Sequence, residues 1–119
     1  MNKTTRKGEK AERFFYEELK AVLPKLKPTT NSGATFSNGD LATPELLIDV
    51  KSTIGSGIPK VSGPDLSKVE QQAQALGKDW IIPVLDSEGN AAVIFPLYLA
   101  KRALKMLYTE EDITWREVQ

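Results

Sequence analysis

The stretch Glu45–Lys51, Glu-Leu-Leu-Ile-Asp-Val-Lys, decides the fold. Side chains of a β-strand alternate between its two faces. One face of this stretch would carry Leu46, Ile48 and Val50, which suit a core. The opposite face ends in Asp49 and Lys51, an acid and a base that are poor core material. Such a pair can serve a metal ion and an attacking water, so we expect a strand over 45–51 that carries chemistry at its end.

Composition restricts that chemistry to oxygen ligands. The chain has no cysteine and no histidine. Zinc–thiolate sites, iron–sulfur clusters, cysteine nucleophiles and Ser-His-Asp catalysis are therefore excluded. A metal held only by carboxylate and carbonyl oxygens favours Mg²⁺ or Mn²⁺ over zinc.

Length and charge indicate one ordinary globular domain. The 119 residues suit a single domain over 1–119, with residues 1–7 expected to be mobile. No apolar run approaches the ~20 residues that span a bilayer, and no signal-peptide core follows the basic N-terminus, so we expect an intracellular, cytoplasmic protein. The net charge is zero, which suggests no general nucleic-acid coat but allows a local basic patch.

Periodicity and turn signals divide the chain into eight expected elements. Helices are predicted over about 8–23, 64–76 and 96–107, and strands over 33–37, 40–42, 45–51, 80–85 and 91–95. Residues 24–31 and 52–63 are expected as loops. Pro83 indicates that its strand lies at an edge or carries a bulge. The apolar stripes of the first two helices are Ala11, Phe14, Phe15, Leu19, Val22 and Leu23, and then Leu66, Val69, Ala73 and Leu76.

Asp40 completes a pattern with the strand. An Asp in Asn38–Leu41, followed after a short gap by Asp49-Val50-Lys51, resembles the active-site signature of the PD-(D/E)XK nuclease superfamily. The order helix, three strands, helix, two strands, helix resembles the αβββαβ core of that restriction endonuclease-like α/β fold. The resemblance covers most of the chain and implies a mixed central sheet flanked by helices.

The resemblance also implies roles at the strand end. Asp40 and Asp49 would hold Mg²⁺ or Mn²⁺, and the Val50 carbonyl would add an oxygen. Lys51 would orient or activate the water, or offset charge on the phosphate. The alternative is a solvated strand face with Asp40 as a turn residue. The apolar strand, the spacing and the element order together favour the active site.

The N-terminal helix supplies a further acid. Lys7–Arg13 resembles the start of archaeal-type Holliday-junction resolvases, in which an acid follows a basic, Gly-containing segment. Glu12 is the preferred match and Glu9 competes with it; a surface glutamate is the alternative. A basic cluster leads into this helix and is predicted to bind the DNA backbone. Its members are Lys3, Arg6, Lys7, Lys10 and Arg13.

Three other segments hold weaker candidates. Ser37 resembles a resolvase serine that touches the scissile phosphate, although a plain hairpin residue is an equal alternative and an arginine often found there is missing. Gln71, Gln72 and Gln74 stand where the superfamily often places a Gln or Lys near the site, although a solvated helix face is the better interpretation for at least two of them. Lys101, Arg102 and Lys105 form either a phosphate patch or, as is more common, a solvated helix face.

These observations predict a metal-dependent DNA endonuclease of recombination or repair, resembling a Holliday-junction resolvase. Such an enzyme cuts two strands symmetrically, and a chain with one active site would need a two-fold homodimer. A nicking, repair or restriction-type nuclease of the same fold is the alternative among enzymes. An inactive DNA-binding or assembly module is the alternative outside them.

Overall fold

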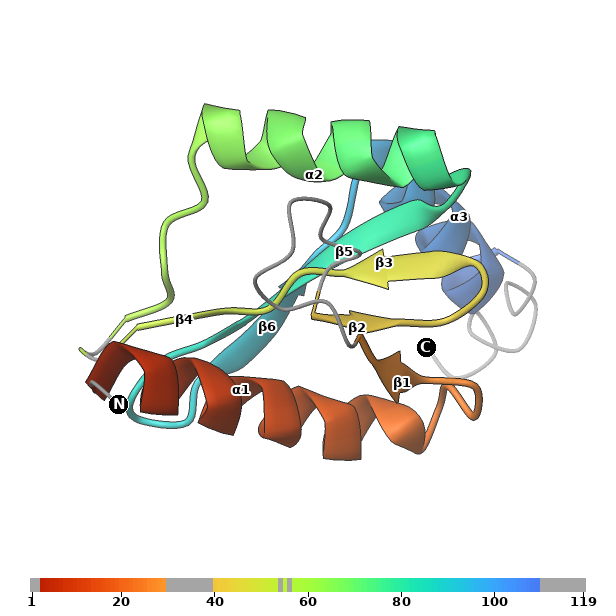
Figure 1. Cartoon of the computed structure of the whole chain (residues 1–119). Helices are drawn as coiled ribbons and strands as arrows, with labels where there is room; N and C mark the ends of the chain where they lie inside the picture. Colours follow the sequence, from red (N-terminus) through yellow and green to blue (C-terminus); the bar gives the residue numbers. More distant parts are fainter. Residues whose placement is uncertain (1–2, 30–39, 54, 56, 110–119) are drawn as a thin grey trace.

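The computed structural model describes residues 3–29, 40–53, 55 and 57–109 (Figure 1). Within them the helices are α1 (Lys3–Lys20), α2 (Gly63–Leu76) and α3 (Leu97–Tyr108). The strands are β1 (Lys27–Pro28), β2 (Leu41–Ala42), β3 (Leu46–Ile48), β4 (Lys51–Ser52), β5 (Asp79–Leu85) and β6 (Ala91–Ile94). No described helix is long and apolar enough to cross a membrane.

The strands form one mixed sheet around β5. β3 and β4 both run parallel to β5 in the same register, with Ile48 beside Ile81 and Lys51 beside Val84. They are therefore successive segments of one extended run along one edge of β5. β6 also pairs with Val84, in the antiparallel sense, so it occupies the other edge. β2 and then β1 extend the sheet beyond β3 in antiparallel pairs.

A helix covers each face of this sheet, with α1 below and α2 above in Figure 1. Phe15 of α1 packs in one buried cluster with Ile48 and Ile81. Val69 of α2 packs in a second cluster with Leu47. Neighbours in the 45–51 run thus lie on opposite faces of the sheet, as the alternation predicts, and the structure shows a core on each face. The mixed α/β fold with helices on a mixed sheet confirms the expected fold class.

Helix α2 matches its sequence signals closely. The Ser62 hydroxyl accepts a hydrogen bond from the Asp65 backbone N–H at 3.2 Å, and the Asp65 carboxylate accepts one from the Ser62 N–H at 3.4 Å. This reciprocal pair forms a capping box. Gly77 ends the helix at φ 67°, a left-handed conformation that glycine adopts without steric cost.

The prediction for Pro83 was wrong. We expected an edge strand or a bulge, but Pro83 is fully buried in β5, which has partners on both edges. In the shared register Pro83 stands opposite Val50, where the run between β3 and β4 is interrupted. A proline lacks the N–H that a parallel ladder needs. The interruption of pairing therefore falls where the central strand has no donor to offer, beside the predicted site.

Other boundaries differ for local reasons. α1 begins at Lys3, within the segment expected to be mobile, and ends at Lys20 rather than Leu23. The Lys20 Nζ donates to the carbonyls of Pro24 and Leu26 at 2.8 and 3.0 Å, which satisfies acceptors beyond the helix end. The loop expected over 24–31 contains β1, because β2 offers it an edge to pair with. The strand expected over 33–37 lies outside the described residues.

Two expected core positions are exposed. Val22 follows the end of α1 and is 70% exposed, and Leu76 in the last turn of α2 is 41% exposed. Both stand at helix ends, where the chain leaves the sheet. The inner stripe positions Ala11, Phe15, Val69 and Ala73 are buried as predicted.

Candidate functional site

An acid and a base lie at the interruption between β3 and β4. Asp49 follows β3 directly, and its N–H donates to the Ile81 carbonyl at 3.1 Å, so its backbone stays tied to β5. Lys51 opens β4. The Lys51 Nζ lies 3.3 Å from the Asp49 carboxylate, and both side chains are partly exposed, at 35% and 21%. The pair is therefore anchored by the sheet and still open to solvent.

Asp40 reaches the same point from the neighbouring strand. Its N–H donates to the Ile48 carbonyl at 2.8 Å, and its carboxylate accepts a hydrogen bond from the Val50 N–H at 2.8 Å. The side chain thus replaces a strand as the partner of Val50. The N–H and C=O of one residue in an extended strand lie on the same edge, so the Val50 carbonyl also belongs to the side of Asp40.

Glu12 joins these acids from α1. It is partly buried and, in its protonated form, donates a hydrogen bond to the Asp40 carboxylate. Burial is the main cause that raises the pKa of Glu12 to about 7, followed by the charges of Asp40, Glu9 and Asp49. Burial is also the main cause that raises the pKa of Asp40. Glu9 is exposed, so of the two competing acids Glu12 is the one that contacts Asp40.

The donors suit a hard divalent cation, because all are oxygens and the carboxylates repel one another. Repulsion from Asp40, Glu9 and Asp49 adds to burial in raising the pKa of Glu12, and a cation would relieve that repulsion. The positions of these side chains in the structure do not form a metal site. The described part of the chain contains no group of three or more His, Cys, Asp or Glu side chains arranged to hold a metal ion. Convergence of Glu12, Asp40 and Asp49 on one ion therefore stays a prediction.

The structure describes the side chains of only some of the residues that are predicted to contact DNA. Lys10 and Arg13 are exposed on α1. Arg6 and Lys7 belong to the same helix, but their side chains lie outside the described part, as does Ser37 altogether. Gln71 and Gln74 are exposed and Gln72 is partly buried on α2.

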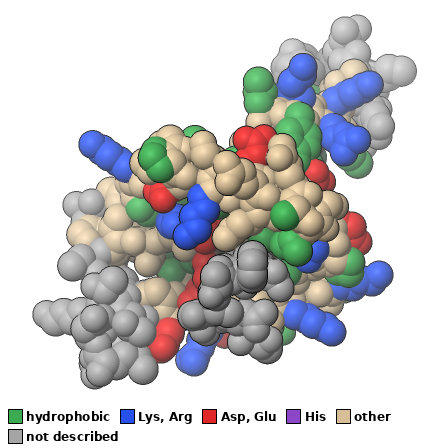
Figure 2. All heavy atoms as spheres, turned by 45° about the horizontal axis from the view of Figure 1, so that its top comes forward, with side chains coloured by type: hydrophobic (Ala, Val, Ile, Leu, Met, Phe, Trp, Pro, Cys, Tyr) green, Lys and Arg blue, Asp and Glu red, His purple; other side chains and the backbone are tan. Residues whose placement is uncertain are grey.

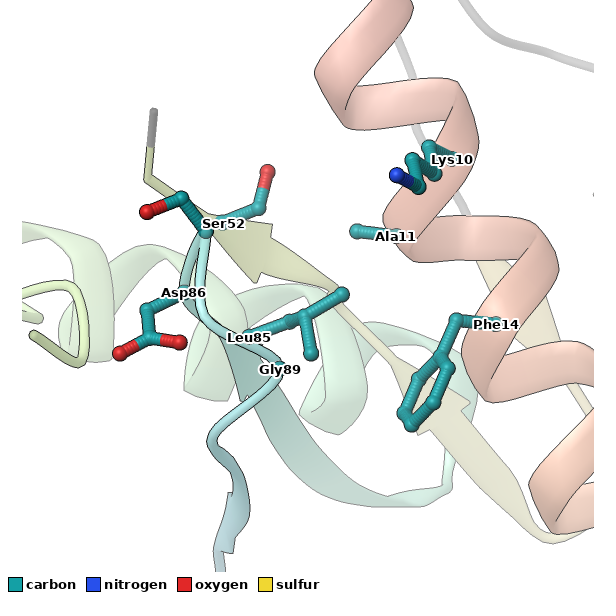
Figure 3. A pocket seen from close by; sticks show the side chains of 8 residues that line it. Lys10, Ala11, Phe14, Ser52, Leu85, Asp86 and Gly89 are labelled. Carbon is teal, nitrogen blue, oxygen red and sulfur yellow. The ribbon is translucent and has the colours of Figure 1, made fainter. Parts of the chain in front are cut away.

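Lys10 borders a small cavity next to the site. The cavity has a volume of about 150 Å³, and Lys10 and Phe14 of α1 face Ser52 and Leu85 across it (Figure 3). Ser52 follows Lys51, so in an extended strand the two side chains point to opposite faces. The charge of Lys51 acts on Asp40 and on Asp65 at the start of α2. The cavity therefore lies on the α1 side of β4, away from the Lys51 ammonium.

Asp86 is a buried acid that the sequence analysis missed. It is 3% exposed and accepts hydrogen bonds from the N–H groups of Gly57, Glu88 and Asn90 at 2.9, 2.9 and 2.8 Å. The Asn90 side chain donates a fourth bond at 2.8 Å, and these bonds lower the pKa of Asp86. Asp86 thus ties the segment after Lys51 to the β5–β6 turn. The sequence signalled only the turn, because the Gly57 contact is long-range.

Comparison with known proteins identifies the fold. The structure is similar to that of Hjc from Archaeoglobus fulgidus, a Holliday junction resolvase from an archaeal hyperthermophile. The TM-score is 0.55 at 16% sequence identity, over 74% of this chain and 76% of that one. No protein-family model matches the sequence, and no curated protein is significantly similar to it. The resemblance to the PD-(D/E)XK fold is confirmed at the level of structure.

Proposed function

With a resolvase-type nuclease fold as the premise, we propose that this chain is a metal-dependent DNA endonuclease. One observation carries the proposal. Glu12 from a helix and Asp40 and Asp49 from adjoining strands interact with one another, and Lys51 pairs with Asp49. Four ionisable groups from three parts of the chain meet at a break in the sheet. A surface ion pair alone would not need the two further acids.

Each residue has a proposed role that follows from its chemistry. Asp40, Asp49 and the Val50 carbonyl, with Glu12 completing the set, would hold Mg²⁺ or Mn²⁺. When bound, such an ion would supply an activated water and neutralise charge on a scissile phosphate. Lys51 is held at the strand end by its contact with Asp49. From there its ammonium is suited to orient the water or to offset phosphate charge.

The proposed substrate is branched DNA, a four-way junction, cut by a homodimer. The support is the fold shared with a junction resolvase and the need for two active sites to cut two strands. The basic residues of α1 supply local positive charge in a chain of zero net charge. Lys10 and Arg13, both exposed, are on the helix that carries Glu12.

Cleavage of a four-way junction against a linear duplex of matched sequence tests the proposal. We expect faster cutting of the junction with Mg²⁺ present. Asp49→Asn keeps the side-chain shape, loses the charge, and should abolish cutting while leaving DNA binding largely intact. Glu88→Gln, an exposed turn substitution, serves as the control that cuts normally. An Asp49→Asn variant that cuts like the wild type would remove Asp49 from the site.

A further inference from the structure

A groove beside β1 and β2 is lined by three lysines. Its volume is about 510 Å³, and Lys25, Lys27 and Lys78 all belong to its lining. As far as the chain is described, that lining contains no acidic side chain, and none of the three lysines forms an ion pair. We call this site the lysine groove. Its positive charge is therefore not neutralised by the described residues of the protein.

The first wall of the lysine groove is held in place at the end of α1. The Lys20 Nζ donates to the carbonyls of Pro24 and Leu26, which flank Lys25. The Leu26 side chain is fully buried. The backbone that carries Lys25 is thus anchored on both sides, while the Lys25 side chain is exposed.

The second wall is held by Lys78 and Thr43. The Lys78 Nζ donates to the Thr43 carbonyl at 2.9 Å. An ammonium group has three donors, so Lys78 keeps two for a ligand. The Thr43 hydroxyl accepts a hydrogen bond from the Glu45 N–H at 3.2 Å and, among the described residues, donates to no other group. Thr43 also lines the groove and can add a hydroxyl donor to the ammonium groups.

Position, more than charge, distinguishes the lysine groove. Figure 2 shows Lys and Arg side chains spread over one face of the molecule and not gathered in a single patch. Basic side chains by themselves therefore do not identify a binding site on this protein. An ammonium group binds phosphate as a point charge, so what matters is whether a phosphate chain can pass the groove and the acids together.

A short stretch of strand joins the lysine groove to the acids. Lys27 pairs with Ala42 in the β1–β2 register, and the Thr29 N–H donates to the Asp40 carbonyl at 3.1 Å. At ~3.3 Å per strand residue, Lys27 is about 7 Å from the level of Asp40 and Pro44 is about 13 Å from it. Figure 1 shows β1 and β2 next to each other, beyond the end of α1.

We propose that the lysine groove binds the backbone phosphates of a DNA arm. One DNA strand advances ~3.4 Å per nucleotide, so the groove corresponds to about two to four nucleotides from the bond that is cut. Contacts there would fix the position of the cut along the arm. The position of the cut rests on the proposed function, whereas the binding of DNA in the groove does not.

The salt dependence of DNA binding tests the groove without any cleavage. Fluorescence anisotropy of a labelled four-way junction is measured with a chelator at ~50 to ~200 mM salt. Lys25→Gln with Lys27→Gln should reduce the log–log slope by ~0.9 for each phosphate that the protein no longer neutralises. At about 0.1 M salt this is roughly 8-fold weaker binding per phosphate, if the affinity at ~1 M salt is unchanged. Lys78 is left unchanged, because its ammonium supports the β2–β3 turn.

A matched pair of lysines provides the control. Lys101→Gln with Lys105→Gln removes two exposed charges from α3, outside the groove, and should keep the wild-type slope. Unchanged circular dichroism would establish that both variants are folded. Uncharged methylphosphonates, scanned along one arm, then locate the contact. Those about two to four nucleotides from the mapped cut should weaken binding of the wild type and not of the groove variant.

Two results would overturn the lysine groove as a DNA site. A Lys25 and Lys27 variant with the wild-type slope would show that these lysines neutralise no phosphate. An equal loss of slope in the α3 control would show that overall charge, and not the groove, sets the slope. A chain that binds DNA through the groove but never cuts it would refute the proposed activity and leave the groove in place.

Discussion

Replacing Glu12 with Gln should make the metal-free protein more stable at alkaline pH. In the folded chain the pKa of Glu12 is raised from 4.5 to about 7, mainly by burial and then by Asp40. The folded state therefore binds more protons than the unfolded state between these two values, and its stability falls as pH rises through them. Below pH 4.5 the carboxyl is protonated in both states and does not lower the free energy of unfolding. Above pH 7 the carboxyl is ionised in both states and the full destabilisation is present.

The size of the effect follows from the shift. If the whole pKa shift of Glu12 is converted at 1.36 kcal/mol per pKa unit, the destabilisation of the folded state is about 3 kcal/mol. The side chain is only partly buried, and solvent screening reduces the expected gain of Glu12→Gln to about 1 kcal/mol at pH 8. The gain should vanish near pH 4.5. Asp40 keeps a raised pKa of its own, so the pH dependence becomes shallower without disappearing.

Urea denaturation at several pH values from 4.5 to 8, with a chelator present, measures this gain. Glu18→Gln changes an exposed glutamate of the same helix and should leave the pH dependence unaltered. Mn²⁺ should then stabilise the wild type at pH 8, because a ligand that binds only the folded state adds to its stability. Equal pH dependence in wild type and Glu12→Gln would refute the contact between Glu12 and the strand acids.

Three further predictions concern the chemistry, DNA binding and the scaffold. Lys51→Ala should slow the chemical step by at least ~10²-fold in single-turnover kinetics. Calorimetric Mn²⁺ binding should survive in that variant, and its loss would assign Lys51 a structural role. Neutralising Arg6, Lys7 and Lys10 together should weaken DNA binding evenly across sequences and reduce the log–log salt slope by ~0.9 for each phosphate that the protein no longer neutralises. Asp86→Ala should lower the melting temperature by several degrees, because it leaves buried N–H groups without an acceptor; an unchanged melting temperature would show that water replaces the carboxylate.

Local signals were enough for much of the fold. The alternation over 45–51 placed Leu47 and Ile48 on opposite faces of the sheet, since the side-chain period of a strand is independent of its surroundings. The cap residues Ser62 and Gly77 bounded α2 because they act on the nearest backbone groups. The same alternation exposed Asp49 beside Lys51.

The site as a whole depended on tertiary contacts. Glu9 and Glu12 lie about one helical turn apart, on neighbouring parts of the surface of α1, so periodicity could not choose between them. The docking of α1 on the sheet decided in favour of Glu12, which contacts Asp40. Asp86 shows the same limit, because its partner Gly57 is remote in sequence.

What the sequence by itself determined was the three helices, the strands over 45–51, 80–85 and 91–95, and an acid–base pair at a strand end, because strand alternation and helix capping act over a few residues. Only the tertiary structure decided how these elements pair. It put Pro83 in the central strand, where the local rule predicts an edge, because the pairing of the neighbouring strand is interrupted opposite it. On the opposite edge of the same run the Asp40 carboxylate accepts a hydrogen bond from the Val50 N–H, and this contact brings together acids from separate segments. No local pattern encodes this contact, since its energy arises between residues that meet only when the sheet forms.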